Sequence, residues 1–228
     1  MTEAPASRQP LAAATLWGLL LALVVPTGLG FVTALAYGTT LTPALVTWGI
    51  AVHWANLLAV IAVVILAERQ RPASIGLQPL RWWTLPLGLV AGFIILPIAG
   101  FLANALGASA DARFAAFLQS LPFATRLLLV LTAGIFEETL FRGYALERLA
   151  SWLGNRWSAG AVTVAVFTLA HIPAVGLAHL LPVLIVSVLI TLLYLWRRDL
   201  VVNIVAHVTI DGVGLLLIPF LRHHGAPT

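Results

Sequence analysis

The sequence predicts an all-α protein, a polytopic bundle of about seven transmembrane helices, from two observations. Of the 228 residues, 61% are hydrophobic and only 9% are charged, whereas globular domains carry about 25% charged residues. The apolar residues also form long uncharged runs, and about 20 apolar residues suffice to cross a bilayer as a helix. The absence of cysteine excludes disulfides, thiolate metal ligands and a cysteine nucleophile.

The predicted spans, in chain order, are 11–37, 43–67, 83–107, 126–148, 158–173, 178–196 and 200–221. The fifth run is short, and its junction with the sixth, around Pro173 and Gly176, is the least defined boundary. Between the third and fourth runs, apolar residues at helical spacing predict a short interfacial helix over 111–120.

The arginines predict the orientation of the bundle. With the N-terminus inside, the inner segments hold Arg8, Arg69, Arg71, Arg81, Arg148, Arg156, Arg197 and Arg198. The outer segments hold Arg113, Arg126 and Arg222. This excess on one side predicts an N-in, C-out topology and accounts for the net charge of +4 without a nucleic-acid partner. Abundant Arg and Ala without Lys favour a bacterial cell membrane (inner or plasma membrane) as the location.

A few polar side chains interrupt the spans, although a charge near the bilayer centre costs at least ~2.5–3.5 kcal/mol. They are Glu137, Glu138 and Arg142 on the fourth span, His171 on the fifth, Asn203, His207 and Asp211 on the seventh, and His53 and Asn56 on the second. A rise of ~1.5 Å per residue places the ionisable groups of three spans at similar depths. We therefore expect a conical polar cavity inside the bundle.

Spacing separates the two neighbouring glutamates. Glu138 and Arg142 lie at i and i+4, in the favourable acid-first order for an ion pair within a helix. Glu137 is rotated by about 100° from Glu138, so one carboxylate can be neutralised while the other projects into the cavity. The polar residues of the seventh span share one stripe, at i, i+4 and i+8.

Three motifs resemble those of the CPBP family of intramembrane proteases, which includes the CAAX prenyl proteases and the bacteriocin-processing (Abi) proteins. EETLFR at 137–142 is similar to the family's EExxxR, FTLAH at 167–171 to its FxxxH, and HVTID at 207–211 to its HxxxB. The resemblance covers 126–221, where it implies a four-span catalytic core. Residues 1–125 then form three N-terminal spans without a matched motif, and 222–228 form a short tail.

The resemblance implies hydrolysis of a peptide bond by an activated water molecule. It makes Glu137 the general base, with His171 binding and polarising the water and His207 donating to the oxyanion. Asp211 stands at a position where the family often has Asn, and we expect it to orient His207 or the water. Supporting roles are expected for Glu138, Arg142, Asn203 and Phe167: an ion pair that fixes the fourth span, an interhelical hydrogen bond, and packing behind the second motif.

Several alternatives stay open at this point. No cofactor is predicted, since HExxH is absent, but Glu137, His171 and His207 are acceptable ligands if zinc takes part. The expected partners are the lipid bilayer and a membrane-anchored peptide or protein substrate. A non-catalytic bacteriocin-immunity protein or scaffold is the main alternative function. A proton-coupled transporter is a further one, although the inverted repeats expected of it are not visible.

Overall fold

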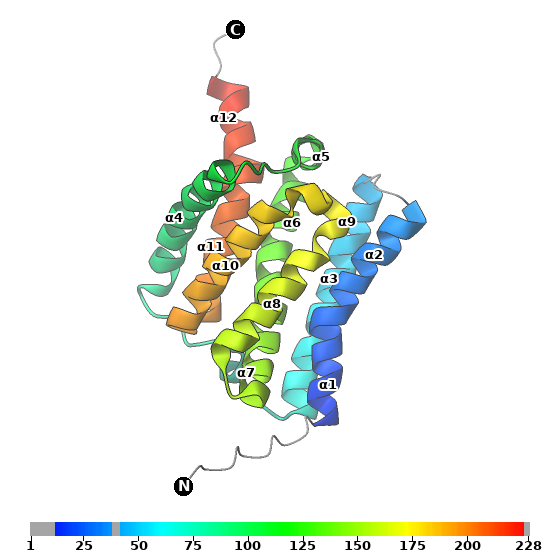
Figure 1. Ribbon diagram of the computed structural model, residues 1–228, viewed down its shortest axis with the longest axis vertical. Coiled ribbons are helices and arrows are strands. Elements are labelled where there is room, and N and C mark those ends of the chain that lie inside the picture. The colour runs from blue at the N-terminus through cyan, green and yellow to red at the C-terminus, as the bar shows by residue number, and fades with distance from the viewer. Residues whose placement is uncertain (1–11, 38–41, 226–228) are drawn as a thin grey trace.

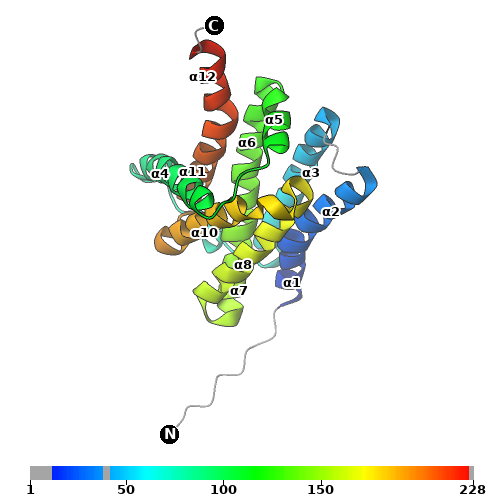
Figure 2. The ribbon, with the colours of Figure 1, turned by 45° about the horizontal axis from the view of Figure 1, so that its top comes forward.

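The structure, a computed structural model, describes residues 12–37 and 42–225, with side chains to 221, and these ranges contain helices and connections but no strand. Both ribbon views place α4, α10 and α11 on one side of α6 and α1, α2 and α3 on the other (Figures 1 and 2). The predicted all-α bundle is confirmed. The predicted tail at 222–228 falls outside the described side chains.

The first two helices form an antiparallel hairpin. Their segments are α1 (Ala13–Leu19), the π-helical η1 (Leu20–Val24), α2 (Val25–Tyr37), α3 (Pro43–Ala62) and the π-helical η2 (Val63–Ala67). Pro43 opens α3 at a position that needs no N–H partner, and the Thr42 hydroxyl accepts a hydrogen bond from the backbone N–H of Leu45. The hairpin follows the runs predicted at 11–37 and 43–67.

Two small residues bring α4 (Thr84–Ala105) against α11 (Leu200–Gly212). A Cβ added at Gly88 would lie 2.6 Å from Cβ of Val205, and one added at Gly92 would lie 2.5 Å from Cβ of Thr209. The pair forms a G-x-x-x-G face, which lets two membrane helices approach closely. Before α4 comes the short 3₁₀ turn η3 (Pro72–Ile75).

A small helix, α5 (Ala112–Ser120), precedes the central helix and matches the helix predicted over 111–120. Its N-cap is Asp111, whose carboxylate accepts hydrogen bonds from the backbone N–H groups of Arg113 and Phe114. These backbone bonds and the nearby Arg113 hold the pKa of Asp111 below its ordinary value, against the opposing effect of desolvation.

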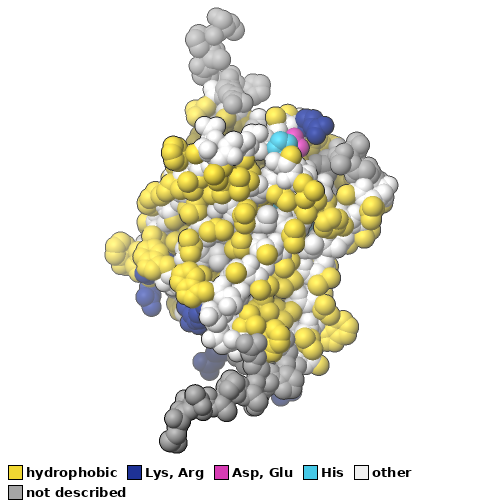
Figure 3. Space-filling view, viewed as in Figure 1, with side chains coloured by type: hydrophobic (Ala, Val, Ile, Leu, Met, Phe, Trp, Pro, Cys, Tyr) yellow, Lys and Arg dark blue, Asp and Glu magenta, His cyan; other side chains and the backbone are white. Residues whose placement is uncertain are grey.

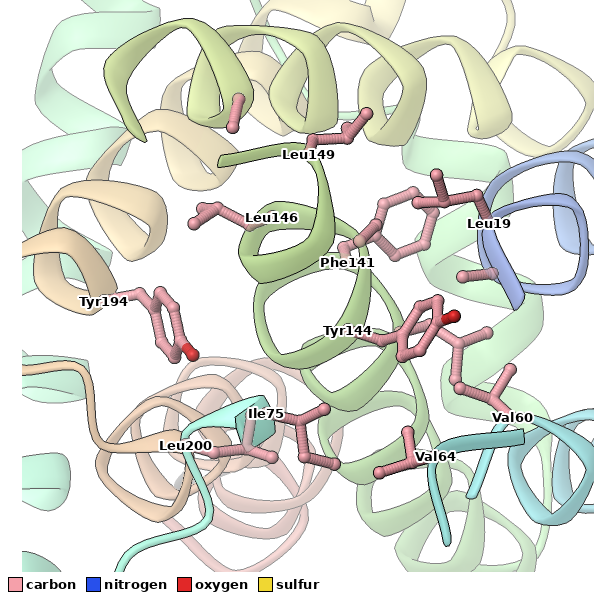
Figure 4. Packing of buried hydrophobic residues seen from close by; sticks show 14 of the residues in the cluster. Leu19, Val60, Val64, Ile75, Phe141, Tyr144, Leu146, Leu149, Tyr194 and Leu200 are labelled. Atoms are coloured by element: carbon pink, nitrogen blue, oxygen red, sulfur yellow. The ribbon is translucent and has the colours of Figure 1, made fainter. Parts of the chain in front are cut away.

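The central helix runs continuously through α6 (Phe123–Glu137), the π-helical η4 (Glu138–Leu146) and α7 (Glu147–Leu153). It extends beyond the predicted 126–148 at both ends. It begins directly after Pro122 and ends before Gly154, which takes φ 67°. Every residue of η4 is buried. Figure 4 shows apolar side chains from neighbouring helices, such as Leu19, Val60 and Leu200, surrounding this segment.

The remaining helices complete the bundle. They are α8 (Arg156–Ala170), α9 (Ile172–Val175), the 3₁₀ turn η5 (Leu177–His179), α10 (Leu180–Arg197), α11, the π-helical η6 (Val213–Leu217) and α12 (Ile218–Gly225). The fifth predicted run, 158–173, lies within the candidate membrane span Arg156–Val175. Inside this span α8 ends at Ala170, with His171 as its C-cap, and Pro173 lies in the short α9. Gly176, with φ 72°, then turns the chain toward α10.

Six described helices are long and apolar enough to span a membrane, so the protein is a multi-pass membrane protein. The central helix is not among the six, because its ionisable residues break the apolar run. The seven-span count and the orientation therefore stay predictions. Figure 3 shows a broad apolar belt with Arg atoms beyond its ends. Three of the predicted inner arginines form ion pairs with two carboxylates at one end of the bundle: Arg148 with Glu68, and Arg156 and Arg198 with Glu147.

Candidate active site

The first motif lies where α6 gives way to the π-helical η4. Glu137 is the last residue of α6 and Glu138 is the first of η4. Both side chains lie in the middle of the bundle, but only the side chain of Glu138 is completely buried, whereas that of Glu137 keeps 21% of its exposure. Local π-helical geometry within α-helices is frequent at functional sites.

Glu138 is the centre of a buried hydrogen-bond network. Its carboxylate accepts hydrogen bonds from Arg142 Nη1 at 2.9 Å, from His207 Nδ1 at 2.7 Å and from Asn203 Nδ2 at 3.2 Å. The predicted i,i+4 ion pair with Arg142 is therefore present. Asn203 Nδ2 also lies 2.9 Å from the carbonyl oxygen of Ile190, so this amide connects three helices, as expected.

The guanidinium of Arg142 is satisfied on its other side by α10. Nη2 donates to the carbonyl oxygen of Ser187 at 3.2 Å and to its hydroxyl at 3.0 Å, and Nε donates to Thr191 Oγ1 at 3.3 Å. Its Cζ also lies 4.5 Å from the centre of the Phe167 ring. Ser187 and Thr191 were not predicted from the sequence. The feature that could have pointed to them is that two hydroxyl residues, four positions apart, lie on one face of an otherwise apolar helix.

His207 lies between the two glutamates. Its Nδ1 donates to Glu138, because the carboxylate is the acceptor, while its Nε2 lies 3.7 Å from Glu137 Oε2 and 3.5 Å from Asp211 Oδ2. The latter two distances are at or beyond the limit of a direct hydrogen bond. The structure thus brings together Glu137, His207 and Asp211 from α6 and α11, and Nε2 is the ring atom that faces the other two.

A cavity of about 370 Å³ opens beside Glu137 and is bounded by α2, α3, α5, α6, α8 and α9. Glu137 and His171 both line it, with His53 from α3 and Thr33 from α2 as its other polar side chains. The remaining lining is apolar and includes Pro26, Leu29, Trp48, Val52, Phe136 and Phe141. The cavity is therefore mainly apolar rather than polar as expected, because two motif-free helices provide much of its wall.

His171 and Phe167 act as a unit at the end of α8. His171 Nδ1 lies 2.8 Å from the carbonyl oxygen of Phe167, which can only accept, so Nδ1 carries the proton and Nε2 of the neutral ring is an acceptor. The two rings are 4.6 Å apart. The packing role expected for Phe167 is present, with Arg142 on one side and His171 on the other.

Both polar residues of the second span contact other helices or the cavity. His53 lines the cavity, with its ring centre 4.3 Å from that of Phe136. Asn56 Nδ2 donates to the carbonyl oxygen of Leu21 at 3.0 Å and so ties α3 to η1. Trp54 Nε1, which sequence analysis did not single out, donates to Thr132 Oγ1 at 3.0 Å and ties α3 to the central helix.

Two further carboxylates hold the far end of the central helix, and sequence analysis missed both. Glu68 accepts hydrogen bonds from Thr15 Oγ1 at 2.9 Å, Tyr144 OH at 2.8 Å and Arg148 Nη2 at 2.7 Å. Desolvation alone would raise the pKa of Glu68, but these donors, Arg148 foremost, hold the pKa below its ordinary value. Glu147 similarly accepts from Tyr194 and Arg198.

The arrangement of donors gives no ready zinc site. Within 12–37 and 42–221, no three His, Asp or Glu side chains are grouped so that they could hold a metal ion. Glu137, His171 and His207, the ligands considered above, are not so grouped, and His207 Nδ1 is already engaged by Glu138.

Comparison with known proteins agrees with this site. Residues 119–213 match the family model described as type II CAAX prenyl endopeptidase Rce1-like. This match supports the resemblance of the segment to the CPBP family. The segment contains all three motifs as well as Ser187 and Thr191, and its similarity to the family model supports, in general terms, a CAAX-type intramembrane protease. No curated protein and no solved structure gives a significant match to the chain.

Proposed function

We propose that the protein is an intramembrane endopeptidase that hydrolyses a peptide bond of a membrane-associated protein or peptide with a water molecule activated by Glu137 and His171. The observation that supports the proposal most directly is that two adjacent carboxylates differ in their hydrogen bonding. Glu138 accepts three hydrogen bonds and is neutralised by Arg142. Glu137 accepts none from a described residue, and it faces the cavity.

Glu137 is suited to act as the general base. A general base must reach the proton that it removes and must not be held by stronger partners. Two observations support this role: the carboxylate of Glu137 lines the cavity, and the nearest ionisable partner, His207 Nε2, is 3.7 Å away, too far for a strong hydrogen bond. A water molecule between Glu137 and the Nε2 of His171 would donate one hydrogen bond to each. As its oxygen attacks the carbonyl carbon, the carboxylate of Glu137 would take one proton, and the other O–H would stay on the oxygen and keep its hydrogen bond to His171.

His207 is suited to stabilise the oxyanion. Its Nδ1 is committed to Glu138, so Nε2 is its only atom that can donate toward the cavity side. Such donors act because they are held in place before charge develops on the substrate oxygen. When Nε2 carries a proton it can donate to the oxyanion, and Asp211 Oδ2, at 3.5 Å from Nε2, is placed to orient the ring.

The lining of the cavity indicates the class of substrate. Apolar side chains from α2 and α3 face Glu137 and His171 across a space of about 370 Å³. Such a wall binds apolar side chains by excluding water. The proposed substrate is therefore a polypeptide that is held at the bilayer and presents apolar residues next to the bond to be cut.

The test is cleavage of membrane-anchored reporter peptides by the full-length protein in liposomes. We compare the wild type with Glu137→Ala and His171→Ala, using His179→Ala as the matched control. His179 is a half-buried histidine outside the cavity, with its Nδ1 2.9 Å from the carbonyl oxygen of Ser109. Cleavage should be lost in the first two variants and kept in the control. Cleavage that persists in Glu137→Ala would contradict the proposed base.

Two further arms separate the alternatives. Loss of cleavage on adding a chelator, restored by zinc, would favour metal assistance. If no reporter is cut and the Glu137→Gln variant still binds a partner protein, the result would favour the scaffold or immunity function. Proton uptake driven by a substrate gradient, without cleavage, would favour a transporter.

A further inference from the structure

A second, basic pocket lies at the end of the bundle where α10 turns into α11. Its volume is about 360 Å³, and it is lined by Ala73, Gly76, Gln78, Arg81, Trp83, Arg197, Arg198 and Asp199. None of these residues belongs to the three motifs. Three guanidinium groups therefore surround one small space on the side of the bundle that the arginine distribution predicts to be cytoplasmic.

Two of the three arginines have no counter-ion within the described chain. Arg198 is paired with Glu147 at 2.7 Å. The carboxylate of Asp199 is used as the N-cap of α11, where it accepts from the backbone N–H groups of Val201 and Val202. Neither Arg81 nor Arg197 forms a side-chain hydrogen bond or ion pair with a described residue. The pocket therefore keeps an unbalanced positive charge.

One aromatic ring holds both unpaired arginines. The Cζ of Arg197 lies 4.4 Å from the centre of a Trp83 ring, and the Cζ of Arg81 lies 5.6 Å from it. Stacking on one indole brings two like charges to the same place, which an anion between them would stabilise. In addition, Nε of Arg197 is a buried donor without a partner among the described residues, and such a donor often marks a ligand or ion.

The surroundings favour an anion that belongs to a lipid. Large apolar side chains next to the pocket residues in sequence are strongly exposed: Leu80 by 68%, Trp82 by 89% and Trp196 by 66%. Tryptophan is enriched at the level of lipid headgroups. Basic pockets between membrane helices on the cytoplasmic side bind anionic headgroups. A free phosphate ion would use the arginines but would gain nothing from this apolar border.

We propose that this pocket binds the phosphate group of an anionic membrane phospholipid, with Arg81 and Arg197 contacting the phosphate and the lipid chains lying along the exposed apolar border. The site lies apart from the Glu137 cavity, with which it shares no lining residue. It does not depend on the proposed proteolysis. The lipid would be a resident ligand rather than a substrate.

Native mass spectrometry of the detergent-solubilised full chain tests the proposal by titrating phosphatidylglycerol against phosphatidylcholine. The variants are Arg81→Gln and Arg197→Gln, and the matched control is Arg71→Gln, an exposed arginine of the same end that does not line the pocket. We expect tight binding of phosphatidylglycerol to the wild type. Each pocket variant should weaken it by about fivefold, since one arginine near a headgroup contributes ~1 kcal/mol, whereas the control should not.

Three other outcomes would overturn the proposal. Equal weakening in all three variants would show attraction to diffuse surface charge instead of a defined pocket. Displacement of the lipid by millimolar inorganic phosphate, or equal binding of both lipids, would show that the lipid is not what the pocket selects. The thermal unfolding midpoint of each variant identifies any that fails to fold, and Arg197→Lys, which keeps the charge, should then retain part of the binding.

Discussion

The two sides of the central helix differ in how fully their polar groups are satisfied. One side, here called the network side, faces α10 and α11. There Glu138 and Arg142 form hydrogen bonds with each other and with side chains of both helices, and both side chains are at most 1% exposed. On the cavity side, Glu137 and His171 face a space lined by apolar groups and keep free lone pairs. His207 is the residue that contacts both sides.

This difference separates holding the site from carrying out its chemistry. The charged groups of this network are paired with one another, so they are held rigidly and fix the ring of His207. A group that lacks partners in the folded protein is free to bind a substrate or a water molecule. The comparison therefore predicts that changes on the cavity side reduce activity while the fold persists, and that changes on the network side reduce stability first.

The largest effect is expected for Glu137→Gln, which keeps the shape of the side chain and removes its basicity. The cleavage rate of a membrane-anchored reporter should fall by about 10²–10⁴, the usual contribution of a general base. Because no described donor loses a partner, the thermal unfolding midpoint should change little. A variant that unfolds early but cleaves normally would reverse the roles of the two sides.

Glu138→Gln is expected to act in the opposite way. It leaves the guanidinium of Arg142 buried without a counter-charge, and removing one partner of a buried pair typically costs about 3–5 kcal/mol. Unfolding by denaturant in detergent micelles measures this loss. The double variant Glu138→Gln with Arg142→Met removes both charges, so it should be more stable than the single variant. If it is not, the pair is not what stabilises this side.

A smaller loss is expected when the hydroxyl of Ser187 is removed. Ser187→Ala deletes one hydrogen bond to a charged group, which is worth about 1.5 kcal/mol, but leaves the backbone carbonyl as an acceptor for Arg142. Val188→Ala, at the next and more exposed position of α10, is a suitable control. Equal destabilisation of the two variants, measured by the same unfolding experiment, would exclude a specific role for the hydroxyl.

The smallest effect concerns Glu68, outside both regions. Its pKa is below the ordinary 4.5 in the folded protein, so its ionised form stabilises the fold at and above that pH. This contribution is lost as pH falls from 4.5 through the lower folded pKa. The wild type should therefore lose stability over this range, and Glu68→Gln should lose less of it. Parallel pH profiles of the unfolding midpoint would contradict the assignment.

The spacing of residues along the chain correctly predicted several helices and one ion pair. The runs at 43–67 and 200–221 coincide closely with observed helices, and the i,i+4 relation of Glu138 and Arg142 became an ion pair. Such features depend on residues a few positions apart, so a single chain segment contains the information. The roles of Glu137, His171, His207 and Asp211 in catalysis stay predictions that the proposed variants test.

Other features depended on distant residues. The hydroxyls of Ser187 and Thr191 gain a role only because Arg142, more than 40 residues earlier, reaches them. Glu68 and Arg148 are loop or helix-end charges in the sequence, yet they lie 2.7 Å apart in the structure. The π-helical form of η4, a segment in which every residue is buried, was also not predicted from the sequence.

By itself, the sequence determined that this chain forms apolar helices and that a few of them carry ionisable groups at similar depths, because lipid requires helical backbones and makes buried charge costly. Only the tertiary structure decided which groups of other helices complete the hydrogen bonds of Glu138 and Arg142, and that Glu137 faces a mainly apolar cavity. That outcome depends on the side chains that α2, α3, α10 and α11 bring to opposite sides of one helix, and helix packing in three dimensions sets it.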